Sequence, residues 1–342
     1  MNNDDIVNVI TNSFSVTEKE NLNIETLLNF IQHTQKNINK ICIAGTPYGL
    51  LLYLLFIKDF SKTLFIFYGN YPLSDAIDEL RKQGYVCLET GRSALTVKEN
   101  DLYLSIIKYL SSNINQYPVT VYGQDTSPIV NEFINDRFVL FEDGRISYIS
   151  RADAKKTKGF HVNIYDSGIN TIIYTGLEPI PKELQCIAQI VDLKEQWNSM
   201  NYLHQKLTLK VFGFDIMEIS QLISSGRDTI LFTRNYSKVG KCSEANQIHM
   251  YTDILSNYDN NKIIIKPHPN DDIDYKQFFG DCIVLPKKMP AELIQFCNLP
   301  IKKVVSVDAT SNVFGVFSNV EIDLYTEMIE KYHIIKTRNT NS

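Results

Sequence analysis

Short apolar runs rich in β-branched and aromatic residues alternate with amphipathic stretches over nearly the whole chain. This alternation is typical of βα units, in which helices connect the strands of a parallel sheet. The first half has such runs at Lys40–Ala44, Thr63–Tyr68, Tyr85–Leu88, Val119–Tyr122, Arg137–Phe141 and Asn170–Tyr174. The second half has them at Asp228–Phe232, Lys262–Lys266, Cys282–Leu285 and Lys303–Val307. The sequence therefore predicts an α/β fold with parallel sheets.

Helical patterns lie between these runs. They are found near Tyr48–Ile57, Leu73–Gln83, Asn100–Ser111, Ser127–Asn135, Glu244–Ser256, Asp274–Phe279, Ala291–Cys297 and Ala309–Phe317. The segment Leu177–Lys182 contains two prolines with a single residue between them, which favour neither helix nor strand. With 342 residues, two domains are the default. We expect an N-terminal Rossmann-like domain at 1–178 and a C-terminal one at 179–342, facing a central cleft.

Charge and hydropathy limit the partners and the location. The formal net charge of −5 lacks the basic excess that nucleic-acid binding requires, so we expect no nucleic-acid partner. The longest apolar run, Gly49–Ile57, is about half the length of a membrane span. The N-terminal residues lack the basic and small-residue features of a secretory signal, which favours a cytoplasmic protein. Six scattered cysteines fit reduced thiols, most of them buried.

The segment Ile263–Pro269 carries the sharpest chemical signal. An isoleucine-rich strand ends at Lys266, and His268 follows between Pro267 and Pro269. The prolines restrict the backbone at the strand's carboxyl end, where open α/β sheets bind ligands. An imidazole held there can bond a phosphate or protonate a leaving oxygen. The alternative is a proline-braced turn with an incidental histidine.

A second segment, Phe138–Gly144, runs from an apolar strand into Glu142, Asp143 and a glycine. Adjacent carboxylates repel each other, so one of them can have a raised pKa suited to accepting a proton near neutral pH. An acidic turn that merely closes the strand is the commoner arrangement.

Three further segments offer polar groups. Glu292 lies in the first turn of a helix behind Pro290, where it either favours the helix dipole or accepts bonds from a ribose diol. Thr310 and Ser311 follow a strand and open a helix, a geometry that presents hydroxyls and amides to a phosphate or simply caps the helix. The turn Gly45–Gly49 opens another helix, whose N-terminal amides could hold an anion or a hydroxyl, although a plain turn is the commoner arrangement.

Two charged segments fit structural roles better. Asp272 and Asp274 have the spacing of a metal-binding DxD, but the stretch is more typical of a helix cap. The basic segment Arg151–Lys158 could touch anionic lipid headgroups, although a solvated loop is the simpler interpretation.

Taken in order, these segments resemble the motifs of the bacterial lipooligosaccharide sialyltransferases, glycosyltransferase family 52, and of the related capsular polysialyltransferases. The family's acidic-acidic-Gly, His-Pro, Pro-x-Glu and Ser/Thr motifs correspond to Glu142-Asp143-Gly144, His268-Pro269, Pro290-Ala-Glu292 and Thr310-Ser311. Thr46-Pro47 resembles a Thr-Pro pair after the family's opening strand. Glu142 stands where many members have Asp, and Thr310 stands where they have Ser; both changes keep the functional group.

The resemblance implies a GT-B fold of two Rossmann-like domains and an inverting reaction that needs no metal. The donor side would be the C-terminal domain, with CMP-sialic acid as the donor substrate rather than any cofactor. His268 would act on the leaving phosphate, Thr310 and Ser311 would bind its other oxygens, and Glu292 would hold the ribose. Lys266, Arg234 and Pro269 are further donor-side candidates.

On the acceptor side, the resemblance implies that Glu142 takes the proton from the attacking sugar hydroxyl and that Asp143 tunes or orients Glu142. The two residues could also exchange these roles. Thr46, Pro47 and Gly144 would contact the acceptor.

The implied activity is a sialyltransferase that transfers a nonulosonic acid, N-acetylneuraminic acid first, to a terminal sugar such as galactose. The acceptor would be a bacterial surface glycan or glycolipid, such as lipooligosaccharide, capsule or O-antigen. Peripheral association with the cytoplasmic face of the inner membrane and a homodimer stay open. The alternatives are a glycerol-phosphate or Kdo-type transferase of GT-B fold and a non-catalytic glycan-assembly subunit.

Overall fold

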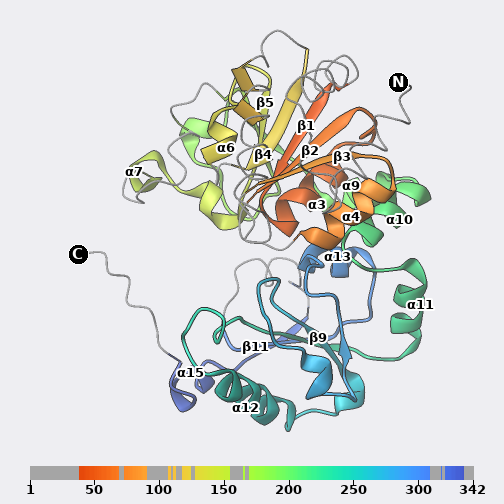
Figure 1. Cartoon of the computed structure of the whole chain (residues 1–342). Coiled ribbons are helices and arrows are strands. Elements are labelled where there is room, and N and C mark those ends of the chain that lie inside the picture. The colour runs from red at the N-terminus through yellow and green to blue at the C-terminus, as the bar shows by residue number, and fades with distance from the viewer. Residues whose placement is uncertain are drawn as a thin grey trace, which may run out of the picture. The chain divides into compact units, whose positions relative to one another are not determined.

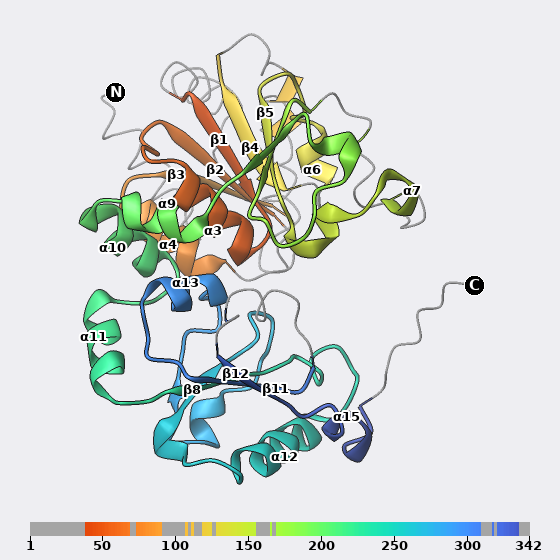
Figure 2. The same cartoon turned by 180° about the vertical axis from the view of Figure 1, so that it is seen from behind.

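The computed structural model describes residues 38–68, 73–90, 107–108, 111–112, 118–124, 128–154, 165, 169–308, 317 and 320–334. The chain forms two compact units, Met1–Asn201 and Tyr202–Ser342, each built on one parallel sheet (Figures 1 and 2). The first unit extends beyond the boundary expected at residue 178, because β7 (Ala188–Ile190) pairs with β6 (Thr171–Tyr174) of the first sheet. The prolines at 179 and 181 therefore lie within a unit, in the connection between two neighbouring strands.

The first sheet consists of β1 (Lys40–Ala44), β2 (Thr63–Tyr68), β3 (Val86–Thr90), β4 (Thr120–Gln124), β5 (Phe138–Phe141), β6 and β7. Its described strands are all parallel, in the order β3-β2-β1-β4-β5-β6-β7. The strand order reverses between β1 and β4. Open α/β sheets bind ligands at this kind of point, outside the carboxyl ends of the strands.

The helices described in the first unit are α3 (Pro47–Phe56), α4 (Ser74–Lys82), α6 (Pro128–Asn131), α7 (Arg151–Ala154) and α9 (Leu193–Ser199), with short 3₁₀ turns η3 (Gly144–Tyr148) and η4 (Lys182–Leu184). Thr46 caps α3 by accepting a hydrogen bond from the Gly49 amide, and Pro47 takes the first helical position. Eight of the ten residues of α3 are buried, which explains its apolar sequence. It packs beside α9 (Figures 1 and 2).

The second sheet consists of β8 (Thr229–Phe232), β9 (Ile263–Lys266), β10 (Ile283–Val284), β11 (Lys303–Ser306) and β12 (Glu321–Leu324). The described strands are parallel, in the order β10-β9-β8-β11-β12. Here the order reverses between β8 and β11. The isoleucines of β9 are wholly buried, as a central strand covered on both faces requires.

The second unit contains α10 (Tyr202–Val211), α11 (Ile216–Ser224), α12 (Glu244–Leu255), α13 (Ala291–Phe296) and α15 (Met328–Lys331), with 3₁₀ turns η5 (Asn260–Lys262) and η6 (Tyr275–Gln277). The apolar side of α12 packs against β9 residues in one core cluster, through Met250, Tyr251, Ile254 and Leu255. Lys331 of α15 pairs with Asp253 of α12, and the two helices lie together in both views (Figures 1 and 2).

The structure confirms the ten predicted strands with small shifts of their ends. The helix expected over Asp274–Phe279 is the single turn η6, and the one expected near Ser127–Asn135 shortens to α6. The helices expected near 100–111 and 309–317 fall largely outside the described residues. All six cysteines are free, and four of them are buried. Within the described segments, no helix has the length and apolarity needed to cross a membrane.

Candidate active site

The first site lies where β1, β4, β5 and β6 end, beside the reversal of strand order. Thr46 comes two residues after β1, Gln124 is the last residue of β4, Glu142 follows β5, and Thr175 follows β6. The carboxyl ends of parallel strands share one edge of a sheet, which is why residues separated by up to 129 positions meet here. Hydrogen bonds connect all four of them.

Glu142 is fully buried, and both of its carboxylate oxygens accept hydrogen bonds. Its Oε1 accepts from the Tyr48 hydroxyl at 2.6 Å and from the Thr175 hydroxyl at 2.5 Å. Its Oε2 accepts from the Tyr148 hydroxyl at 2.5 Å and from the Thr175 amide at 2.8 Å. Tyr148 is itself fixed, because its oxygen accepts from the amides of Gly176 and Leu177 at 3.0 Å each. Four donors therefore hold this carboxylate in one orientation.

Asp143 has a different environment from its neighbour. It is only partly buried, and its amide donates to the Ser147 hydroxyl at 2.6 Å. Desolvation, followed by the charge of Glu142, raises the pKa of the Asp143 carboxyl to about 6. The expectation that one member of the acidic pair has a raised pKa is met by Asp143, although burial contributes more than repulsion.

The other residues predicted for this site have internal roles in the structure. The Thr46 hydroxyl donates to Gln124 Oε1 at 2.9 Å as well as capping α3. Pro47 is buried at the start of α3. Gly144 opens η3 with a φ of +60°, a conformation that glycine adopts without strain. Contact of these three residues with an acceptor stays a prediction.

A second site lies at the carboxyl ends of β8, β9 and β11, again at the reversal of strand order. Arg234 follows β8, His268 follows β9 and Asp308 follows β11. Arg234 Nε lies 3.4 Å from Asp308 Oδ2, which also accepts a 2.8 Å hydrogen bond from the Tyr236 hydroxyl. The guanidinium is thereby held at the edge of the sheet by a carboxylate that is itself fixed.

His268 is partly buried, and its contacts define which ring nitrogen can donate. The Asn270 amide donates to Nδ1 at 3.1 Å, so in the neutral ring the proton is on Nε2. Desolvation, with the positive charges of Arg234 and Lys266, lowers the pKa of His268 to about 4. Near neutral pH this imidazole is therefore an uncharged donor in a positive environment, a combination suited to an anion.

Lys266 is buried, and its ammonium faces backbone rather than open space. Nζ donates to the carbonyl oxygens of Pro267 at 2.5 Å and of Lys287 at 2.8 Å. Desolvation lowers the pKa of Lys266 to about 7, opposed by the negative charge of Glu292. Glu292 is also buried, in the first turn of α13. Lys266 thus ties the His268 loop to the segment that leads into α13.

Pro269 is partly buried beside His268. Thr310 and Ser311 lie outside the described residues, so their place in this site stays a prediction.

Asp272 and Asp274, the possible DxD, lie in a capping stretch, which is the structural role that the sequence favoured. Asp272 pairs with Lys238, and Asp274 caps η6 by accepting from the Lys276 amide. The preceding Asp271 is buried and accepts bonds from Gln247 and Tyr275. Among the residues that the structure describes, no group of three or more His, Cys, Asp or Glu side chains could hold a metal ion.

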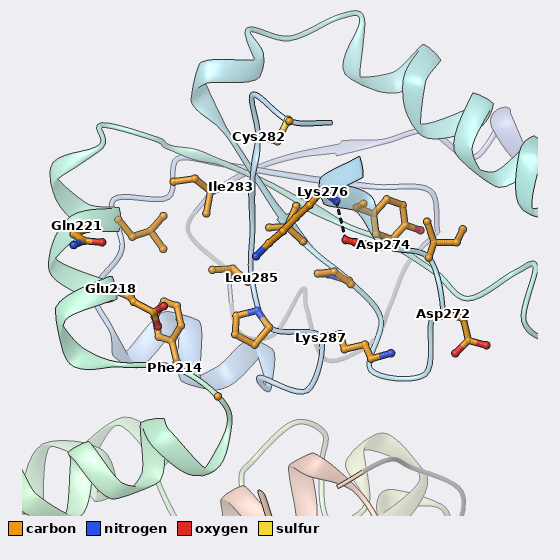
Figure 3. Close-up of a pocket in the computed structure, with 18 residues that line it drawn as sticks. Phe214, Glu218, Gln221, Asp272, Asp274, Lys276, Cys282, Ile283, Leu285 and Lys287 are labelled. Atoms are coloured by element: carbon orange, nitrogen blue, oxygen red, sulfur yellow. Dashed lines mark hydrogen bonds between the residues drawn. The ribbon is translucent and has the colours of Figure 1, made fainter. Parts of the chain in front are cut away.

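A cavity of about 920 Å³ lies in the second unit beside the edge strand β10 (Figure 3). Phe214, Glu218 and Gln221 line it from the side of α11, and Leu285 and Lys287 line it from the segment after β10. Its wall includes Pro267 but none of the residues predicted for the donor side. The lining mixes apolar surface with charges of both signs.

Several residues of the first site were not expected from the sequence: Tyr48, Gln124, Tyr148 and Thr175. Gln124 ends β4 and Thr175 directly follows β6, while Tyr48 lies in the first turn of α3 after β1 and Tyr148 ends η3 after β5. That position was the available signal, since each of these polar residues follows a predicted apolar strand. Nothing in the sequence distinguishes these four residues from the many other polar residues that follow strands.

Comparison with known proteins identifies the family. The sequence profile of glycosyltransferase family 52 matches residues 97–339, well over half of the chain. An uncharacterised protein of Haemophilus influenzae strain Rd is 26% identical over 235 residues, which cover 67% of this chain and 76% of that protein.

Two similar solved structures are bacterial sialyltransferases. The GT-B domain of the Photobacterium damselae enzyme aligns with a TM-score of 0.52 and 14% identity, over 80% of this chain and 87% of that one. The 2,6-sialyltransferase of Photobacterium sp. JT-ISH-224, solved with CMP and lactose, aligns with a TM-score of 0.58 and 14% identity, over 88% and 77% of the two chains. At this identity the likeness establishes the fold. The profile match and the two parallel sheets together place this chain in glycosyltransferase family 52, as an enzyme of GT-B fold.

Proposed function

We propose that this glycosyltransferase is a sialyltransferase, which moves a nonulosonic acid from a CMP donor to a hydroxyl of a terminal sugar on a bacterial surface glycan. One observation carries the proposal: in a family 52 chain, the acidic pair and the His-Pro motif each lie at the carboxyl edge of one parallel sheet. The similar Photobacterium enzyme bound to CMP and lactose supports the same donor class and a galactoside acceptor.

In the proposed reaction, Asp143 accepts the proton of the attacking hydroxyl. A base with a pKa near 6 is mostly ionised at neutral pH and still basic enough to take a proton. Glu142 instead orients the turn, because its four hydrogen bonds occupy the carboxylate. This is the exchange of roles that the sequence left open.

On the donor side, His268 stabilises the leaving group. The acceptor oxygen bonds to the anomeric carbon of the donor sugar while the bond from that carbon to the phosphate oxygen breaks, with inversion. Nε2–H of His268 donates to the departing phosphate of CMP, whose charge Arg234 also compensates. Glu292 accepts bonds from the ribose hydroxyls, and Thr310 and Ser311 bind further phosphate oxygens. A single phosphate carries less charge than a diphosphate, so these residues can stabilise it without a metal ion.

The proposal is tested by incubating the purified protein with CMP-N-acetylneuraminate and a panel of galactosides that includes lactose. We expect release of CMP and a product heavier by one sialyl residue in mass spectrometry. Parallel incubations with CMP-Kdo and CDP-glycerol test the alternative transferases. Transfer from one of those donors alone, or melting that CMP leaves unchanged, would contradict the proposed donor class.

A further inference from the structure

We infer that Gln124 is a positioning residue for the acidic pair, and that the turn Thr46–Gly49 serves to hold Gln124. The catalytic meaning of this inference rests on the proposed function, since it concerns the base of that reaction. The contact network itself does not depend on the substrate.

Gln124 is fully buried at the end of β4, next to β5 in the sheet. Its Nε2 donates to the Glu142 carbonyl at 2.8 Å and also reaches Asp143 Oδ1 at 3.4 Å. One amide group therefore contacts the backbone of the first acidic residue and the side chain of the second. This contact from the neighbouring strand restrains the side chain of Asp143. Within its own turn, Asp143 is held through its backbone amide, which donates to the Ser147 hydroxyl.

Thr46 fixes which end of the Gln124 amide faces the acidic pair. The Thr46 oxygen accepts a hydrogen bond from the Gly49 amide, so its proton is available to Gln124 Oε1 at 2.9 Å. A hydroxyl that donates to the amide oxygen leaves the amide nitrogen pointing the other way. The hydrogen bonds then run in one direction, from the start of α3 through Thr46 and Gln124 to Asp143.

Gly49 is needed for space rather than for an unusual backbone angle. A Cβ added at Gly49 would lie 2.2 Å from Gln124 Oε1 and 2.6 Å from its Cδ, closer than atoms can approach. Gln124 is buried on all sides, so its amide has little freedom to move away. The turn after β1, which the sequence left as a weak anion-binding signal, thus has a specific structural purpose.

The groups that face Asp143 are few, so a change in its pKa can be interpreted. Among the described residues they are the charged Glu142 carboxylate, the neutral Gln124 amide from β4 and the Ser147 hydroxyl from η3. An amide that donates to a carboxylate stabilises its charged form, so loss of the amide raises the pKa. A third carboxylate at position 124 would raise it further.

The test compares Gln124→Met, Gln124→Glu and Gly49→Ala with the wild-type protein. A second pair, Thr46→Val and Thr46→Ser, removes and then restores the hydroxyl. Gly280→Ala is the matched control for the glycine change, because a Cβ there meets no atom within 4 Å. Two readouts are used: the pKa of Asp143 from ¹³C NMR titration, and kcat separated from the KM of the donor.

We expect the first three variants and Thr46→Val to raise the Asp143 pKa and to lower kcat about 10- to 100-fold, the size of effect that a misplaced catalytic group produces. The donor KM should change less than about 2-fold, because the donor residues are on the other unit. Thr46→Ser should keep the wild-type pKa of Asp143 and recover most of the kcat that Thr46→Val loses. Gly280→Ala should keep wild-type values of both kcat and the pKa.

Folded variants with wild-type kcat and an unchanged Asp143 pKa would overturn the inference. So would a Thr46→Ser protein as impaired as Thr46→Val. If Gln124→Met does not fold, the Thr46 pair decides the outcome. If the wild-type protein transfers no sugar, the proposed function fails, whereas the NMR titration still supports or overturns the positioning by Gln124.

Discussion

Glu142 and Asp143 are adjacent in the chain but differ in environment. Glu142 is fully buried and accepts four hydrogen bonds, whereas Asp143 is partly buried and has its pKa raised to about 6. Neighbouring carboxyl groups with separated environments are the usual way in which a site assigns one group to hold and the other to exchange a proton. In the proposed reaction, the acidic motif therefore divides into an orienting residue, Glu142, and a base, Asp143.

The pH dependence tests this division. We expect kcat/KM of the wild-type enzyme to fall below about pH 6, because Asp143 becomes protonated there and cannot accept the acceptor's proton. Asp143→Asn should lower kcat about 10²- to 10⁴-fold and remove the acidic limb. Glu142→Gln should retain that limb and move it to lower pH, since the charge that helps to raise the Asp143 pKa is gone. Loss of the limb in Glu142→Gln, with Asp143→Asn almost fully active, would assign the base to Glu142.

His268 gives a second prediction at this scale. In the free protein its pKa is about 4, lowered by burial and by two neighbouring cations. A bound phosphate dianion opposes those cations, so CMP should raise the pKa, whereas cytidine should not. NMR titration of the imidazole with each compound measures this directly. Equal shifts with both compounds would separate His268 from the phosphate.

The ionisable residues proposed for these sites could be singled out from the sequence, whereas the residues that hold them in place could not. Glu142, Asp143 and His268 stand out because each follows an apolar strand within an unusual local sequence. Gln124, Tyr148 and Thr175 are ordinary polar residues whose importance comes from contacts across strands. Such contacts depend on strand order, which a single sequence does not reveal.

At the level of elements, strands with continuous apolar sequence were predictable, and short or polar elements were not. β7 has three residues and β12 is largely exposed, so neither has an apolar run. The capping box of α11, in which Asp215 and Glu218 bond each other's backbone amides, was a readable signal for that helix. The single turn η6 replaced a predicted helix because Asp274 caps only one turn, and Gly280 follows soon after.

Arg227, just before β8, connects the amino ends of neighbouring strands in the second sheet. Its guanidinium donates to the carbonyls of Asn260, Ile263 and Asp281, at 2.8 Å each. Arg227→Met should lower the free energy of unfolding by about 1–3 kcal/mol, because these carbonyls lose a charged donor.

Chemical denaturation followed by circular dichroism measures this change. Lys262→Met is the matched control, because the exposed Lys262 makes one such bond, to Gly226, and its loss should cost less than about 1 kcal/mol. Equal destabilisation by the two changes would contradict the bridging role of Arg227. CMP binding should be unaffected in both, because these carbonyls lie at the end of the sheet opposite to His268.

For the whole molecule, alternation of strands and helices was enough to predict two parallel α/β units. The position of the boundary was not predictable from the prolines, because a proline-rich connection can join two strands of one sheet. The observed first unit ends at Asn201, after β7 and α9 have been added to it. The amino-acid composition around residues 179–201 does not show that this segment belongs to the first unit.

Metal dependence is a property of the complete enzyme. We expect EDTA to leave the transfer rate essentially unchanged, because His268 and Arg234 are proposed to neutralise the leaving phosphate. A rate lost in EDTA and restored by magnesium or manganese would contradict the metal-free reaction. It would also direct attention back to Asp272 and Asp274.

The central claim, that the acidic pair and His268 serve one sialyl transfer, is tested most directly by product analysis with CMP-N-acetylneuraminate and lactose. The account predicts a sialylated lactose from the wild-type protein, detected by mass spectrometry, and at most about one hundredth of its rate from folded Asp143→Asn and His268→Ala proteins. Undiminished product from either variant, or none from the wild-type protein with any CMP-nonulosonate and galactoside, would contradict it.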